Sequence, residues 1–74
     1  MNERDWKDFA TKIIRVEMKN HNMQIKDLIL NLEKMGIQET YWSFSAKLRR
    51  RSFSSGFFLA CLEAMGIEEI NLKY

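Results

Sequence analysis

The residues best suited to chemistry lie in a basic run, KLRRR, at positions 47–51. The run contains Lys47, Arg49, Arg50 and Arg51, and the surrounding segment 40–62 contains no acidic residue. Cations at the end of a helix complement the negative pole of its dipole, and a charged run is usually just a solvated face. The same run can instead neutralise the phosphates of a nucleic acid. The elements that carry the run decide between these two interpretations.

Other kinds of site have little support in the sequence. There is one cysteine, Cys61, and one histidine, His21, so neither an internal disulfide nor the usual four-ligand zinc site can form. The chain has no glycine-rich phosphate loop and no paired nucleophile and base. We therefore expect no enzyme, no cofactor and no metal. Cys61 is interpreted as a small core residue and His21 as a turn or capping residue.

Length and composition predict one small globular domain spanning residues 1–74. Apolar residues make up 46% of the chain and charged residues 30%, a balance typical of folded proteins. The longest apolar run, FFLACL at 57–62, is far shorter than the ~20 residues that cross a bilayer. The first residues contain no apolar segment of the kind found in secretory signals. We therefore expect a cytoplasmic protein that does not bind membranes.

The spacing of apolar residues predicts an all-α fold. The chain has no proline and three glycines, and apolar positions recur at intervals of three and four. These patterns predict helices at about 3–20, 24–35, 39–50 and 54–65, the first capped by Asn2. In the first helix, Trp6, Phe9, Ala10 and Ile13 share the apolar face. Glu17 lies on that face too, and we expect a cationic partner such as Lys47.

Two helices end in nearly the same sequence, LEKMGI at 32–37 and LEAMGI at 62–67. Each places a glycine where the backbone turns left-handed, at Gly36 and Gly66. An isoleucine follows each glycine and can fold back on the leucine five residues earlier, which is typical of a Schellman termination. We interpret the similarity as a shared helix stop and not as a repeat architecture.

The helix at 39–50 carries the basic run and has two distinct faces. Tyr41, Phe44, Ser45 and Leu48 share the side that we expect to be buried. The opposite side is small and basic, with Trp42 at its margin. A helix in a major groove needs small side chains near the bases and cations near the phosphates. The predicted nucleic-acid-binding residues are Trp42, Ser43, Ala46, Lys47, Arg49, Arg50 and Arg51.

Aromatic residues near the run have different expected roles. Phe53 precedes the expected cap Ser54 and lies five positions before Phe58, so we assign it to a hydrophobic staple. Trp42 has three interpretations: it packs on another helix, stacks on the sugar-phosphate backbone, or anchors a protein partner. Few aromatic residues alternate with the cations, which favours duplex DNA over single strands or RNA.

The order of these elements resembles the helix-turn-helix domain of the lambda repressor and Cro class. More closely, MQIKDLILNLEKMGI at 23–37 and FSAKLRRRSFSSGFFLACLEAMGI at 44–67 resemble an uncharacterised family of small bacterial domains, over about Trp6 to Leu72. We expect a compact bundle of four to five helices with a short extended C-terminal tail, and the resemblance implies that the bundle has the lambda-repressor-like fold. It also implies that the second helix supports the third, which reads the DNA.

Two functions follow as expectations. The first is double-stranded DNA binding by a small transcriptional regulator-like protein, with the helix at 39–50 in the major groove and its cations on the phosphates. The alternative is a protein-interaction or adaptor module of a bacterial or phage system, in which the same helix and Trp42 bind an acidic partner.

The C-terminal segment EEINLKY alternates apolar Ile70, Leu72 and Tyr74 with polar residues. This period of two predicts a short strand or an extended arm. A single strand needs a partner. We therefore expect the segment Ile70–Tyr74 to pack on the first helix or to pair with its copy in a homodimer.

Overall fold

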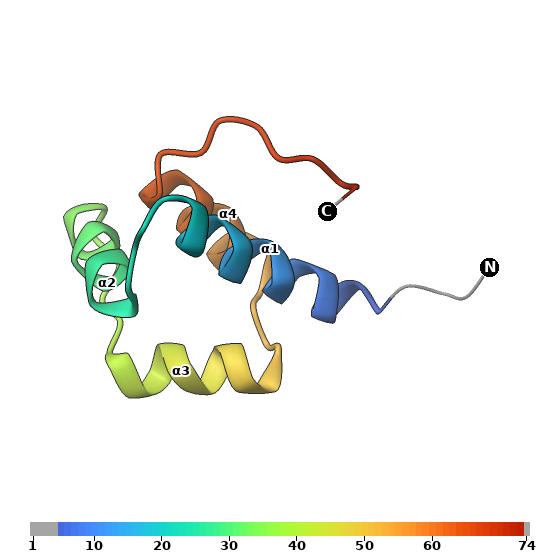
Figure 1. Cartoon of the computed structure of the whole chain (residues 1–74). Helices are drawn as coiled ribbons and strands as arrows, with labels where there is room; N and C mark the ends of the chain where they lie inside the picture. The colour runs from blue at the N-terminus through green and yellow to red at the C-terminus, as the bar shows by residue number, and fades with distance from the viewer. Residues whose placement is uncertain (1–4, 74) are drawn as a thin grey trace.

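The computed structural model describes residues 5–73, which contain four helices joined by short connections (Figure 1). They are α1 (Trp6–Asn20), α2 (Ile25–Lys34), α3 (Tyr41–Arg50) and α4 (Ser55–Ala64). Helix α4 packs against α1 and α2, and α2 also packs against α3. The all-α prediction is confirmed. Within residues 5–73 there is no strand and no fifth helix, and no helix there is both long enough and apolar enough to cross a membrane.

Side-chain oxygens cap α1, α3 and α4 at their N-terminal ends. Asp5 caps α1 by accepting N–H groups of the first turn, so the helix begins later than predicted, and Asn2 lies outside the described residues. Because the Asp8 backbone N–H favours the ionised carboxylate, the pKa of Asp5 is lowered. Thr40 caps α3, and Ser54 caps α4 as predicted.

The predicted stops of α2 and α4 are confirmed. Gly36 and Gly66 have φ angles of +85° and +75°, the left-handed conformation. The N–H of Ile37 donates to the carbonyl of Leu32 at 3.0 Å, and Ile67 repeats this bond with Leu62 at 3.0 Å. With the bonds from each glycine N–H to the residue three before it, these complete two Schellman motifs.

The core lies where the four helices meet. Its fully buried side chains come from every helix: Ile13, Ile14, Leu28, Leu32, Phe44 and Cys61. Cys61 is thus a core residue, as predicted, and burial raises the pKa of its thiol to about 12. Trp6 was expected on the buried face but is 66% exposed, because α1 extends past the core at this end.

The expected partner of Glu17 was wrong. The carboxylate of Glu17 is buried on α1 as predicted, and it lies 3.5 Å from Nε2 of His21, one turn later. Lys47 is instead bonded to Glu39. His21 is the C-terminal capping residue of α1, in agreement with its predicted structural role.

The predicted C-terminal strand is also not present among the described residues. Residues 72 and 73 form a turn, in which the Lys73 N–H donates to Asn71 Oδ1 at 2.8 Å, and Tyr74 lies outside the described residues. No neighbouring strand among residues 5–73 offers the backbone partners that a strand requires. Ile70 instead packs against the core, and with Leu72 and α1 it lines an apolar groove of about 180 Å³.

The Gly66→Ala variant should lose about 1–2 kcal/mol of unfolding free energy, because alanine in the left-handed conformation brings its Cβ close to the next carbonyl. The Gly56→Ala variant is the matched control: Gly56 lies inside α4, and a Cβ there meets no atom within 4 Å. It should gain about 0.5–1 kcal/mol, since alanine loses less backbone entropy in a helix. Urea denaturation measures both, and a stable Gly66→Ala variant would contradict the assigned helix stop.

The Cys61 thiol should resist alkylation in the folded protein. A pKa raised from 9.0 to about 12 leaves about a thousandfold less thiolate near pH 8 than an ordinary cysteine has. Mass spectrometry after iodoacetamide treatment should show slow modification of the native protein and rapid modification in concentrated guanidinium chloride. Equal rates in the two conditions would show that the residue is accessible.

Candidate nucleic-acid interface

Helix α3 lies along one edge of the bundle (Figure 1). It is attached by one face, on which Phe44 and Leu48 are 0% and 6% exposed. The ring of Phe44 also packs against Phe53 and Phe57, at centroid distances of 5.7 and 6.0 Å. This anchoring turns the opposite face of α3 away from the core. The two faces therefore separate as predicted except at two positions: Tyr41, which was expected to be buried and is 53% exposed, and Lys47, which was expected to face outward and is bonded to Glu39.

The outward face contains the small side chains that were predicted to approach a duplex. Ser43 is exposed and Ala46 is partly exposed, so neighbouring segments do not bury this strip, although the Lys47 ammonium donates to Ser43 Oγ at 3.5 Å. The Ser43 N–H bonds to the cap Thr40 at 3.0 Å, which fixes the first turn of the helix. A flat strip at this position lets another surface approach the α3 backbone closely.

Lys47 does not project from this strip. Its ammonium donates to both carboxylate oxygens of Glu39, at 2.8 and 3.1 Å, and lies 4.5 Å from the centroid of the Phe57 ring. The side chain of Glu39 is only 6% exposed and that of Lys47 is 31% exposed, so the carboxylate is largely withdrawn from water. Lys47 therefore compensates the charge of the Glu39 carboxylate.

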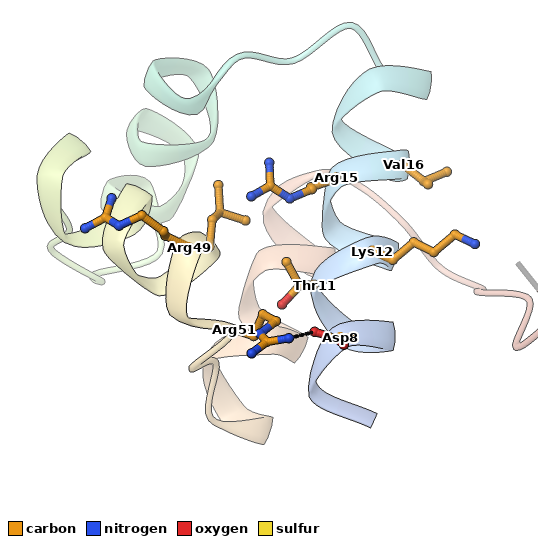
Figure 2. Close-up of a pocket in the computed structure, with 8 residues that line it drawn as sticks. Asp8, Thr11, Lys12, Arg15, Val16, Arg49 and Arg51 are labelled. Atoms are coloured by element: carbon orange, nitrogen blue, oxygen red, sulfur yellow. Dashed lines mark hydrogen bonds and ion pairs between the residues drawn. The ribbon is translucent and has the colours of Figure 1, made fainter. Parts of the chain in front are cut away.

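The arginines of the run occupy the C-terminal end of α3 and the residue after it. Arg49 and Arg50 are exposed and have no ion-pair partner among residues 5–73. Arg51 has a φ of +54°, the left-handed conformation that glycine adopts at the other helix ends. Its guanidinium bonds to Asp8 of α1 (Figure 2), and this hydrogen bond raises the pKa of Arg51. The run is thus divided, with Lys47 turned inward and three arginines at the surface.

Helix α1 contributes cations that the sequence analysis missed. A cleft of about 560 Å³ separates α1 from the end of α3. Its lining residues are Asp8, Thr11, Lys12, Arg15, Val16, Leu48, Arg49 and Arg51. Figure 2 shows that Arg15 extends from α1 toward α3, whereas Lys12 extends on the other side of α1. A usable signal was present, because Asp8, Lys12, Arg15 and Lys19 recur at helical spacing and share one face of α1.

The exposure of Trp42 excludes one of the three roles that were considered for it. Trp42 is 80% exposed, so it is not packed on another helix. Its only ring contact among the described residues is with Tyr41, edge-to-face at 5.6 Å. Phe53, in contrast, stacks on Phe57 at 5.5 Å. Phe53 therefore serves folding, as predicted, although the ring that it stacks on belongs to Phe57 and not Phe58.

Among residues 5–73, no group of three or more histidine, cysteine, aspartate or glutamate side chains could hold a metal ion. The side chains that converge at the surface are cations with a few small and aromatic neighbours. Such a gathering of positive charge attracts anions.

Residues 6–70 match a family described as a domain of unknown function (DUF6471). No curated protein and no solved structure matches the chain. The matched segment contains all four helices, the basic run and the cations of α1. On the evidence of this match, the chain belongs to the DUF6471 family.

Proposed function

We propose that this chain is a cytoplasmic, double-stranded DNA-binding protein in which α3 enters the major groove. One observation carries the proposal: α3 lies along one edge of the bundle, and its outward face presents the small side chains of Ser43 and Ala46, followed by exposed arginines. Ser43 and Ala46 permit close approach to base edges, and Arg49 and Arg50 reach the flanking phosphates. The major groove, about 12 Å wide, accommodates an α-helix.

In this proposal α2 supports α3 as the first helix of a helix-turn-helix supports the second. The two helices are in contact, and α3 is anchored by Phe44 and Leu48. The connection between them covers residues 35–40, longer than the ~3–4 residues of a typical helix-turn-helix. A longer connection changes the angle between the helices, so the angle at which α3 meets the groove differs from that of the repressors.

Phosphate contacts and DNA shape should dominate the affinity. The exposed positions of α3 include no asparagine or glutamine, the side chains that pair with adenine in two hydrogen bonds. Arginines bind phosphates of any sequence. The protein should therefore bind many duplex sequences with similar affinity and discriminate among them mainly through their shape and deformability.

The Arg50→Ala variant should weaken binding to random duplex DNA and make its salt dependence shallower by about 0.9 in log–log slope, because one phosphate contact is lost. The matched Arg50→Lys variant retains the charge and should keep the parent slope. Fluorescence anisotropy over a salt series measures both quantities. If Arg50→Ala binds as tightly as the parent at ~50 mM salt, the groove assignment is wrong.

A second candidate function is favoured by the exposed aromatic pair. Trp42 and Tyr41 are 80% and 53% exposed at the start of α3, where they could fill pockets on an acidic protein. In that case Trp42→Ala would remove binding to the partner, and random duplex DNA would leave the amide signals of α3 unchanged. Amide shifts that map to α3 and its arginines on titration with duplex favour DNA.

We also propose that the C-terminal segment Ile70–Tyr74 supports a homodimer. In support, Ile70 and Leu72 line the apolar groove beside α1, yet Leu72 remains 61% exposed and Trp6 in the same groove is 66% exposed. A two-fold axis here could place two α3 helices about 34 Å apart, the spacing of successive major grooves.

Deletion of residues 69–74 should convert the dimer to a monomer, because it removes the apolar residues of this surface. The Leu72→Asp variant should do the same without shortening the chain, and Asn71→Asp is its control for the added charge. Light scattering measures the mass. A parent protein that is already monomeric, with unchanged mass in the variants, excludes the dimer.

A further inference from the structure

The cleft between α1 and the end of α3 concentrates positive charge. The residues that line it include four cations, Lys12, Arg15, Arg49 and Arg51, and one carboxylate, Asp8, so the lining has a formal net charge of +3. Arg51 contacts Asp8, and Lys12 extends on the other side of α1. The whole protein has a net charge of only +2. The positive charge of the cleft therefore exceeds the net charge of the whole protein. The local electrostatic potential is positive and attracts anions.

The two helices contribute guanidinium groups to this cleft from opposite sides. Arg15 extends from α1 toward α3, and Arg51 reaches from the end of α3 to Asp8 (Figure 2). The bond to Asp8 engages Nη1 of Arg51, and a guanidinium has five N–H donors, so most of its donors stay available. The exposed ion pair with Asp8 holds the Arg51 guanidinium beside α1 in this structure.

The remaining lining offers little to a ligand other than an anion. Leu48 and Val16 are apolar, and the hydroxyl of Thr11 already donates to the Lys7 carbonyl at 3.0 Å. A base or sugar would find few hydrogen-bonding groups to distinguish it. A phosphate needs only charge and N–H donors, which the arginines supply in the forked geometry that fits its oxygens.

The position of the cleft indicates which phosphate it receives. It adjoins the C-terminal end of α3, where Arg49 belongs both to the exposed run and to the cleft lining. The negative pole of the α3 dipole lies at this end and repels a phosphate, so an anion binds here only if nearby cations outweigh the dipole. The cations of α1 provide that excess.

We propose that Arg15 and Arg51 hold a backbone phosphodiester of the same duplex whose major groove α3 occupies, with Lys12 at the rim. This inference rests on the proposed function and extends it: α1 becomes the second DNA-contacting helix and fixes the register of α3. A phosphate held between two helices restricts rotation of the protein in the groove, which contacts from α3 alone do not.

The test compares Arg15→Ala with Lys34→Ala, which removes the same charge from the end of α2 and lies outside the cleft. Each full-length variant is titrated with a random 20-base-pair duplex at several salt concentrations, by anisotropy. Arg15→Ala should make the slope of log affinity against log salt concentration shallower by about 0.9. The affinity that this variant loses relative to the parent should therefore be about 3.5-fold smaller at ~200 mM than at ~50 mM salt. Lys34→Ala should keep the parent slope. Circular dichroism confirms that both variants are folded.

A second arm separates a backbone phosphate from a free one. In amide-shift titrations, the duplex should move the signals of Thr11, Arg15 and Arg51 together with those of α3, whereas millimolar inorganic phosphate should move them weakly. Strong shifts with inorganic phosphate and none with duplex would overturn the proposal in favour of a small-anion site.

The outcomes distinguish the two proposals. If duplex binds through Arg50 but Arg15→Ala retains the parent slope, the α1 contact is wrong and the proposed function stands. If the parent does not bind duplex at all, both are wrong.

Discussion

The ion pair between Glu39 and Lys47 is the constraint on which the surface of this protein depends. It joins the segment before α3 to the middle of that helix, beside the Phe57 ring of α4. Because Glu39 is almost fully buried, loss of its partner would leave a carboxylate without compensation in the interior. The pair therefore ties the segment before α3 to the middle of the helix, beside the Phe57 ring. It acts together with the buried Phe44 and Leu48, which turn the opposite face of the helix toward solvent.

The basic run consequently has more than one role. Its first cation stabilises the fold, its last is held by Asp8 in a left-handed backbone, and the exposed Arg49 and Arg50 lie between them. Lys47 thus has a structural role, whereas the proposed function assigns the exposed arginines to the phosphates of a duplex. The arginines also compensate the negative end of α3, and this role does not prevent them from binding a phosphate.

The charge distribution gives the molecule two unlike ends. The cleft beside α3 is cationic, whereas Glu63, Glu68 and Glu69 line a cleft with the exposed Leu59 near the end of α4. Figure 1 places the segment after α4 on the opposite side of the bundle from α3. A nearly neutral chain with such separation is oriented by an anionic surface before contact, with the acidic end turned away. This property suits a duplex that must meet α3 first, as the proposed function requires.

The sequence by itself determined the features that depend on residues close together in the chain. These features are the four helices, the cap at Ser54 and the stops at Gly36 and Gly66. Their hydrogen bonds span at most five residues, so the types of neighbouring residues were enough to predict them. The burial of Cys61 followed from helical periodicity for the same reason.

Only the tertiary structure decided which charges meet. Lys47 pairs with Glu39 and not with Glu17, and Arg51 bonds to Asp8, 43 positions earlier in the chain. The cations of α1 and those at the end of α3 line the same cleft. The exposure of Trp6 and Tyr41 likewise depends on where the core ends. These outcomes depend on the angles at which the helices cross, which arise from the packing of many side chains at once and have no local pattern in the sequence.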